Sequence, residues 1–486
     1  MGPPSSQIAS DSNPVQVLGF AALLGFIYAY NSRVLDMHFY YLHLPLVLGA
    51  TSGICALIAG SLFKAFRTRA GILYLGLTCW FAAGVPFAYW RGGSADQVAG
   101  WLRTLVIWAL LVGLTVTFRE CKLLLNVVVF AGATAALMAL FGEGVEVGGR
   151  LSLERGIFSN PNYFALELLI VLPFVWRLYS GVGRFVVFRR VLAAGSGGVI
   201  LLALFKSGSR AGLYSLGVMV FLVILRVSLI RKIQIALAAG VLFVSIFAAL
   251  PGSLRVRYFT FSGMEGAQIG SALVDISAAA STLERQHTLR ESLSITLTHP
   301  IFGIGLGNFT PYVNQVNRDS GARKEAWLGT HNTYTQMSSE AGIPALLMFL
   351  GIIGVTWRSL TRLIRATRRD DRPKARDINH AAHAVQVCLG SLCFFLVFIH
   401  LAYDIYPPMV IGFALAVAYT GERELRELDA QQLPPVAGSF GGDREVLFSG
   451  GSGTVQIPRT VGRPSAALSM TAEGRHTAPA DSPRPV

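Results

Sequence analysis

Two short polar segments carry residue types suited to group transfer at a phosphate. In the first, Ser207-Gly-Ser209-Arg210-Ala-Gly212, an arginine lies between glycines where two apolar stretches meet. The planar guanidinium matches phosphate oxygens, and the hydroxyls of Ser207 and Ser209 offer further donors. An arginine at such a boundary also reaches lipid headgroups readily, so this segment alone leaves both interpretations open.

The second segment is Gly329-Thr-His331-Asn332-Thr-Tyr334, with Glu340 opening the apolar stretch that follows. His331 is a candidate general base because the unperturbed pKa of imidazole is about 6.5. A lone histidine is often a structural hydrogen-bonding residue instead. A catalytic role for His331 is favoured because Arg210 and Arg285 are expected to share its site.

Two further motifs favour structural roles. Gly303-Ile-Gly305-Leu-Gly307 has the spacing of a nucleotide-binding turn, but it follows a helix-like stretch and Pro300 rather than a strand. It therefore predicts a tight glycine turn packed against apolar helices. Asn160-Pro-Asn162 predicts a turn and the beginning of a helix.

The elements that must position these residues are membrane spans. The chain has 486 residues, of which 53% are hydrophobic and only 14% charged, whereas soluble domains carry about a quarter charged residues. A soluble enzyme, a DNA-binding protein and a disordered scaffold are thereby excluded, and an all-α polytopic membrane protein is predicted. Windows long enough to cross a bilayer of ~30 Å predict about twelve spans, near residues 15–31, 39–63, 71–90, 101–118, 122–141, 162–179, 191–205, 211–229, 233–250, 341–360, 384–403 and 407–421.

The distribution of basic residues predicts the orientation of these spans. With the N-terminus inside, the inner loops hold 17 lysines and arginines and the short outer loops hold 6, in agreement with retention of positive charge on the cytoplasmic side. Both termini are then cytoplasmic. Topology and contact with anionic lipid account for the net charge of +14, so no nucleic-acid partner is expected.

The predicted spans and their orientation divide the chain into five regions. Residues 1–14 form a cytoplasmic N-terminus, 15–250 hold spans one to nine, and 251–340 form a large periplasmic loop with an amphipathic helix over 281–298. Residues 341–421 hold the last three spans. Residues 422–486 form a cytoplasmic tail whose Pro-, Gly- and Ser-rich composition predicts disorder from about residue 431.

Charged residues gather at the predicted outer face, and spans five, seven and nine contain none apart from Lys122 at the inner edge of span five. A proton-coupled transporter would be expected to carry a relay of ionisable groups deeper in the bilayer. The pattern instead favours an enzyme acting at the boundary between membrane and water.

In their order along the chain, these motifs resemble the O-antigen ligase and O-antigen polymerase superfamily. The resemblance covers roughly residues 150–360 and includes the long external loop between spans nine and ten. It implies a membrane glycosyltransferase of the GT-C type without a metal or cofactor. It makes Arg210 and Arg285 pyrophosphate-binding residues and His331 the catalytic residue. Candidate supporting residues are Asn162, Arg155, Ser209, Asn332 and Glu340.

One departure from the superfamily pattern is visible. Members often have an aromatic residue four positions after the arginine equivalent to Arg285, and this chain has Leu289 there. The departure bears on local packing more than on the chemistry.

The resemblance predicts transfer of a glycan from undecaprenyl pyrophosphate to an acceptor hydroxyl, with inversion, at the periplasmic face of the bacterial inner membrane. Lipid A-core is the expected acceptor, which makes the chain O-antigen ligase-like. Alternatives with the same fold are a polymerase of lipid-linked repeat units for O-antigen, capsule or exopolysaccharide, and a protein O-oligosaccharyltransferase. An alternative of another class is a non-catalytic exporter of lipid or polysaccharide, in which Arg210 and His331 would only bind substrate.

Overall fold

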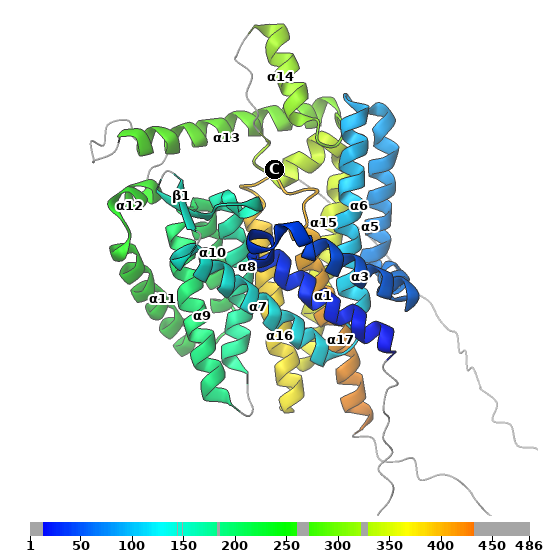
Figure 1. Cartoon of the computed structure of the whole chain (residues 1–486), viewed down its shortest axis with the longest axis vertical. Helices are drawn as coiled ribbons and strands as arrows, with labels where there is room; N and C mark the ends of the chain where they lie inside the picture. Colours follow the sequence, from blue (N-terminus) through cyan, green and yellow to red (C-terminus); the bar gives the residue numbers. More distant parts are fainter. Residues whose placement is uncertain are drawn as a thin grey trace, which may run out of the picture. The chain divides into compact units, whose positions relative to one another are not determined.

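A computed structural model describes residues 13–142, 144–147, 149–181, 185–259, 272–321 and 329–431 (Figure 1). Most of the predicted N-terminal region 1–14, and the tail predicted to be disordered from about residue 431, lie outside the described residues. The same holds for two parts of the predicted periplasmic loop, residues 260–271 and 322–328. The division into five regions stays a prediction.

The described chain is built almost entirely from helices. They are α1 (Pro14–Ser32), α2 (Val34–His38), α3 (Leu44–Ile58), α4 (Ser61–Phe66), α5 (Arg69–Gly84), α6 (Arg91–Leu114), α7 (Phe118–Phe141), α8 (Pro161–Ser180), α9 (Val186–Lys206), α10 (Arg210–Ile224), α11 (Leu229–Ala249), α12 (Gly252–Phe259), α13 (Ala272–Thr298), α14 (Phe309–Ser320), α15 (Thr333–Thr367), α16 (Pro373–Phe395) and α17 (Tyr406–Ala430). Three short 3-10 helices cover Tyr40–Leu42, Val85–Phe87 and Gly156–Ser159.

Ten helical segments of the described chain are long and apolar enough to cross a membrane. The predicted span 211–229 coincides with α10, an apolar helix of 15 residues, and the predicted span 407–421 coincides with α17. The remaining predicted spans each overlap one of the ten. The protein is therefore an all-α polytopic membrane protein, as its composition predicts.

The spanning helices differ in how much of their surface packs against protein. Thirteen residues of α8 and thirteen of α16 are buried, and these two helices pack against each other. In α11 no residue is buried, and apolar side chains such as Ile230 and Val241 are exposed. An exposed apolar helix of this length is suited to contact with lipid.

Helix beginnings follow the local signals in the sequence. Pro161 is the first residue of α8, and the Asn160 side chain accepts a hydrogen bond from the backbone N–H of Asn162 (2.9 Å). This confirms the predicted turn and helix start. Helix α7 begins with a reciprocal pair in which Thr117 and Glu120 bind each other's backbone N–H, an arrangement that satisfies donors left free in the first turn.

A short hairpin follows α7, and the sequence did not predict it. Strands β1 (Gly144–Val147) and β2 (Arg150–Leu153) pair antiparallel, with Val147 opposite Arg150. The sequence signal was the Gly-Gly pair at 148–149, which is typical of two-residue hairpin turns. The hairpin brings Arg150 next to Asn162.

Helix α15 is interrupted at Gly342, where φ is +85° and ψ is 170°. The chain around Pro300–Gly307 fills this interruption, because Ile304 and Gly305 donate to the carbonyls of Ser339 and Glu340 (3.0 and 2.9 Å), and Ile343 donates to Pro300 (2.8 Å). A Cβ at Gly342 would lie 1.7 Å from the Ile301 oxygen. The predicted glycine turn against an apolar helix is confirmed, and this contact explains why glycine is required.

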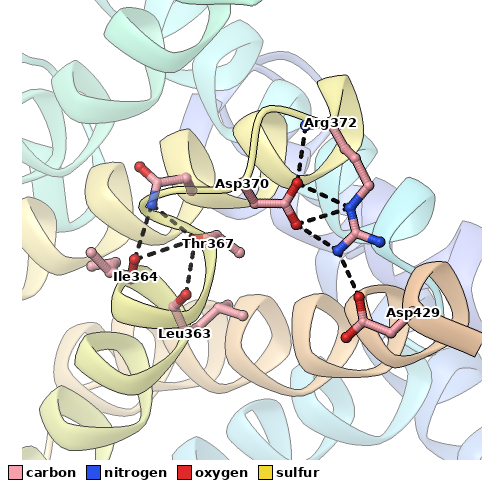
Figure 2. Close-up of polar contacts among 7 residues, drawn as sticks. Leu363, Ile364, Thr367, Asp370, Arg372 and Asp429 are labelled. Atoms are coloured by element: carbon pink, nitrogen blue, oxygen red, sulfur yellow. Dashed lines mark hydrogen bonds and ion pairs between the residues drawn. The ribbon is translucent and has the colours of Figure 1, made fainter. Parts of the chain in front are cut away.

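At the other end of α15, ion pairs hold the turn that leads to α16 and join it to α17 (Figure 2). The Arg372 guanidinium binds Asp370 (2.5 Å) in the connecting turn and Asp429 (2.6 Å) on α17. The backbone N–H of Arg372 also donates to Asp370 (2.9 Å). This junction fixes the turn between α15 and α16.

Candidate active site

A cavity of about 310 Å³ opens beside the beginning of α15. Four parts of the chain form its wall: the first turns of α10, the middle of α13, the residues just before α15 and the segment just after α16. The lining residues are Arg210, Ala211, Tyr214, Thr282, Arg285, Gln286, Leu289, Thr330, His331, Asn332, Val397 and Phe398. The cavity thus brings together Arg210, Arg285 and His331, which the sequence analysis proposed as one site.

Arg210 is held at the cavity by a tight turn. Ser209 caps α10, since its hydroxyl accepts from the backbone N–H of Gly212 (3.2 Å) and donates to Asn162 (3.0 Å). Gly208 has a φ of +60°, a conformation that favours glycine. The Arg210 guanidinium donates to the hydroxyl of Thr282 on α13 (3.3 Å), so the turn and α13 meet at the cavity.

Two further arginines hold the same turn from outside the cavity wall. Arg150 donates to the carbonyl of Ser207 (3.0 Å) and to the side-chain oxygen of Asn162 (2.9 Å). Arg257 on α12 donates to the carbonyl of Gly208 (3.2 Å). Burial lowers the pKa of Arg150 to about 9, and the charges of Arg257, Arg285 and Arg210 contribute. The cavity therefore lies in a strongly positive region.

Arg285 lies half-buried on α13. Its Nε is buried and has no hydrogen-bond partner among the described residues. Burial lowers the pKa of Arg285, and the neighbouring charges of Arg210 and Arg257 lower it further. A buried donor without a partner is costly, and an anionic ligand in the cavity would relieve that cost.

His331 has a strained backbone at the cavity wall. Its φ is +51°, which is uncommon for a residue with a side chain. Burial lowers the pKa of the imidazole to about 4, with contributions from His400 and Arg285. His331 is therefore neutral at pH 7, the form that can accept a proton. Asn332 fixes its position by capping α15, since its side chain accepts from the N–H groups of Tyr334 and Thr335 (2.9 and 3.1 Å).

Part of the cavity wall is apolar. Tyr214, Leu289, Val397 and Phe398 line it. Leu289, the residue that departs from the superfamily pattern, belongs to this wall. The cavity therefore combines cationic donors, one neutral imidazole and an apolar surface, a combination suited to an amphiphilic ligand with an anionic group.

The other candidate supporting residues do not line the cavity. Asn162 and Ser209 hold the turn before Arg210. Glu340 is buried, and its carboxylate accepts from the N–H groups of Gly307 and Phe309 (3.1 and 3.0 Å), which gives it a place in the glycine turn. Arg155 is exposed in the turn after β2.

Sequence reasoning did not select Arg150, Arg257 or His400 as members of the site. In the sequence, Arg150 and His400 are only two of several charged or polar residues near the predicted outer face. The hairpin brings Arg150 close to the site, and the segment that follows α16 brings His400 close to it. Arg257 had a weak signal, as a basic residue just after the predicted span 233–250.

The comparison with protein families bears on the segment that holds the cavity. Residues 195–350 match the O-antigen ligase family. The match confirms the resemblance of the motifs and supports assignment to the O-antigen ligase-like superfamily. No curated protein sequence matches the chain.

The matched O-antigen ligase segment contains Arg210, Arg285, His331 and Glu340, and it ends within α15. It supports a role in glycosyl transfer during O-antigen or polysaccharide biosynthesis, by an enzyme of the ligase or polymerase type. The family also implies a lipid-linked glycan and an acceptor as substrates at a membrane.

Proposed function

We propose that this protein transfers a glycan from undecaprenyl pyrophosphate to an acceptor hydroxyl, and that the acceptor is lipid A-core. The reaction takes place at the periplasmic face of the bacterial inner membrane, with both termini in the cytoplasm. The observation that carries the proposal is the cavity itself, whose wall holds two arginines, a neutral histidine and four apolar side chains.

The arginines suit the leaving group of this reaction. Breaking the bond between sugar C1 and the pyrophosphate oxygen builds negative charge on the pyrophosphate, and Arg210 and Arg285 stabilise this charge as it develops. Their fork-shaped guanidiniums bind phosphate oxygens in pairs. Because the two guanidiniums supply this stabilisation, the proposed mechanism requires no metal ion.

His331 is the general base of the proposed reaction. Its neutral imidazole accepts the proton of the acceptor hydroxyl as the oxygen attacks C1. Attack on the face opposite the leaving pyrophosphate inverts the anomeric centre. Binding of the pyrophosphate favours a protonated imidazole nearby, so the substrate raises the pKa of His331 from about 4 and makes it a stronger base in the complex.

The apolar wall suits the isoprenoid chain of the carrier. Tyr214 lies on α10, and Val397 and Phe398 follow α16 directly. A lipid approaching between these elements would bring its headgroup to Arg210, which is the first residue of α10. The acceptor would then enter from the aqueous side, beneath α13.

The test uses purified protein in lipid with an undecaprenyl pyrophosphate-linked glycan and lipid A-core. We expect His331→Ala to lower the rate of transfer by about 10²- to 10⁴-fold, the usual contribution of a general base. His287→Ala is the matched control, because His287 is an exposed histidine of α13 outside the cavity wall. Equal product yields from wild type and His331→Ala would favour the exporter and contradict the catalytic role.

A deletion strain separates the ligase from the polymerase. A ligase-deficient strain accumulates long glycan on the lipid carrier and leaves lipid A-core bare. A polymerase-deficient strain carries a single repeat unit on the core. Glycan missing from a protein acceptor, with normal lipid A-core, would indicate the protein O-oligosaccharyltransferase.

A further inference from the structure

A second histidine lies directly behind His331. The ring centroids of His331 and His400 are 5.3 Å apart, and the ring planes make an angle of 73°. His400 follows α16 and does not line the cavity, whereas His331 does. The two histidines therefore form an edge-to-face pair in which only one member faces the substrate.

The chain around His400 is fastened to the chain that follows His331. Thr333 makes three hydrogen bonds to this segment: its N–H donates to Leu396 (2.9 Å), its hydroxyl donates to Ile399 (2.6 Å), and the same hydroxyl accepts from Leu401 (3.0 Å). Thr333 thus binds the residues on both sides of His400. The spacing between the two histidine rings is set by backbone contacts as well as by the rings.

The His400 ring also contacts Gly329. A Cβ at Gly329 would lie 2.7 to 2.8 Å from three atoms of the imidazole. A side chain there would displace the ring, because real Cβ atoms do not approach other atoms so closely. The ring consequently packs against both Gly329 and His331 and supports the turn in which His331 has its strained backbone.

We propose that His400 is a positioning residue, whose ring holds the His331 imidazole toward the cavity. The inference rests on the proposed function, since it matters only if His331 is the base. A general base must lie within hydrogen-bond reach of the proton that it accepts, and a displacement of about 1 Å can cost about 100-fold in rate. His400 itself needs no contact with substrate to have this effect.

The test compares kcat and KM for the lipid-linked donor. His400→Ala leaves a space behind His331 and is expected to lower kcat by about 10- to 100-fold. The KM for the donor stays near the wild-type value because Arg210 and Arg285 are unchanged. His400→Phe keeps an aromatic ring and is expected to recover most of the lost kcat.

A second variant tests the same contact without altering either histidine. Gly329→Ala is expected to displace the His400 ring and to lower kcat. In the double variant Gly329→Ala/His400→Ala the overlap is relieved, so its kcat should equal that of His400→Ala alone. If His400→Ala folds poorly, the kcat of Gly329→Ala by itself still tests the contact.

The outcomes separate this inference from the proposed function. The positioning role would be overturned by wild-type kcat in both His400→Ala and Gly329→Ala, or by additive losses of kcat in the double variant. It would also be overturned by a loss confined to KM, or by a His400→Phe variant as slow as His400→Ala. Those results with an inactive His331→Ala leave the proposed function standing. An active His331→Ala overturns the proposed function itself.

Discussion

The two ends of helix α15 hold arginines in opposite ways. At the far end, Arg372 lies between two carboxylates, those of Asp370 and Asp429. At the beginning, Arg150 and Arg257 donate to neutral backbone carbonyls. The carboxylates raise the pKa of Arg372, whereas burial and mutual repulsion lower the pKa values of Arg150 and Arg285.

This difference separates charges that fasten helices from charges suited to a ligand. An arginine whose charge is already matched gains little from an anion. A group of arginines that repel one another gains much, because an anionic ligand stabilises them all. The beginning of α15 is therefore where a pyrophosphate is expected, and the far end is expected to serve the fold.

Among the effects that compare the two ends of α15, the largest is expected from Arg285. Arg285→Gln keeps a polar side chain that can donate hydrogen bonds, but this side chain is shorter and lacks the charge that faces the leaving group. We expect kcat/KM for the lipid-linked donor to fall by about 10²- to 10³-fold, the usual cost of losing one group that stabilises a developing negative charge. Initial rates with purified protein in lipid measure this change.

Arg290 provides the matched control for Arg285. It lies on the same helix, is exposed and does not line the cavity. Arg290→Gln should keep wild-type kcat/KM. Equal losses in the two variants would mean that the general positive charge of α13 matters rather than the position of Arg285, and the comparison between the two ends would lose its meaning.

The next effect concerns the interruption of α15 at Gly342. Gly342→Ala places a Cβ 1.7 Å from the Ile301 oxygen and puts a side chain at a φ of +85°. Backbone strain of this kind costs about 1–3 kcal/mol before the overlap is counted. We expect a clearly lower unfolding temperature and less folded protein in the membrane.

The same helix contains the control for Gly342. Gly354 has no atom within 4 Å of its would-be Cβ, so Gly354→Ala should leave the unfolding temperature unchanged or raise it slightly, as alanine favours helix. Thermal unfolding in detergent, followed by fluorescence, compares the two variants. Similar behaviour would contradict the role assigned to the glycine turn in holding α15.

A smaller effect is expected from pH. The proposed base must be neutral, and His331 is protonated below its pKa of about 4. The kcat/KM for the donor should therefore be constant near neutral pH and fall as the pH drops toward 4. In the complex the pyrophosphate raises the pKa of His331, so kcat should begin to fall at a higher pH than kcat/KM. If kcat and kcat/KM fell at the same pH, no anion would bind near His331.

Much of the fold follows from the sequence because a membrane restricts what a chain can do. Apolar windows of sufficient length indicate helices, and each predicted span overlaps a helix of the structure. The hairpin at β1 and β2 was missed because four-residue strands give little periodicity. The break at Gly342 was missed because it depends on the glycine turn, which approaches from a distant part of the chain.

The candidate site could be predicted only as far as the motifs reach. Arg210, Arg285 and His331 belong to motifs of the superfamily, and the structure places all three on one cavity. Arg257 and His400 could not be chosen in this way. Their roles arise from contacts with Gly208 and Gly329, which are set by tertiary packing and leave no spacing in the sequence.

The smallest effect is expected at the far end of α15, at Asp370. Hydrogen bonds from Arg372 hold the pKa of Asp370 below its usual range. A depressed carboxyl pKa stabilises the folded state above the unfolded pKa, and this contribution disappears as the pH falls through the folded pKa. Asp370→Asn should therefore lower the unfolding temperature slightly at neutral pH, as is usual for an ion pair near the surface, and the difference from wild type should vanish in acid. The transfer rate should not change, because Asp370 lies in the turn that follows α15, at the opposite end of that helix from the cavity. A loss of transfer as large as that of Arg285→Gln would show that the paired charges also serve the reaction.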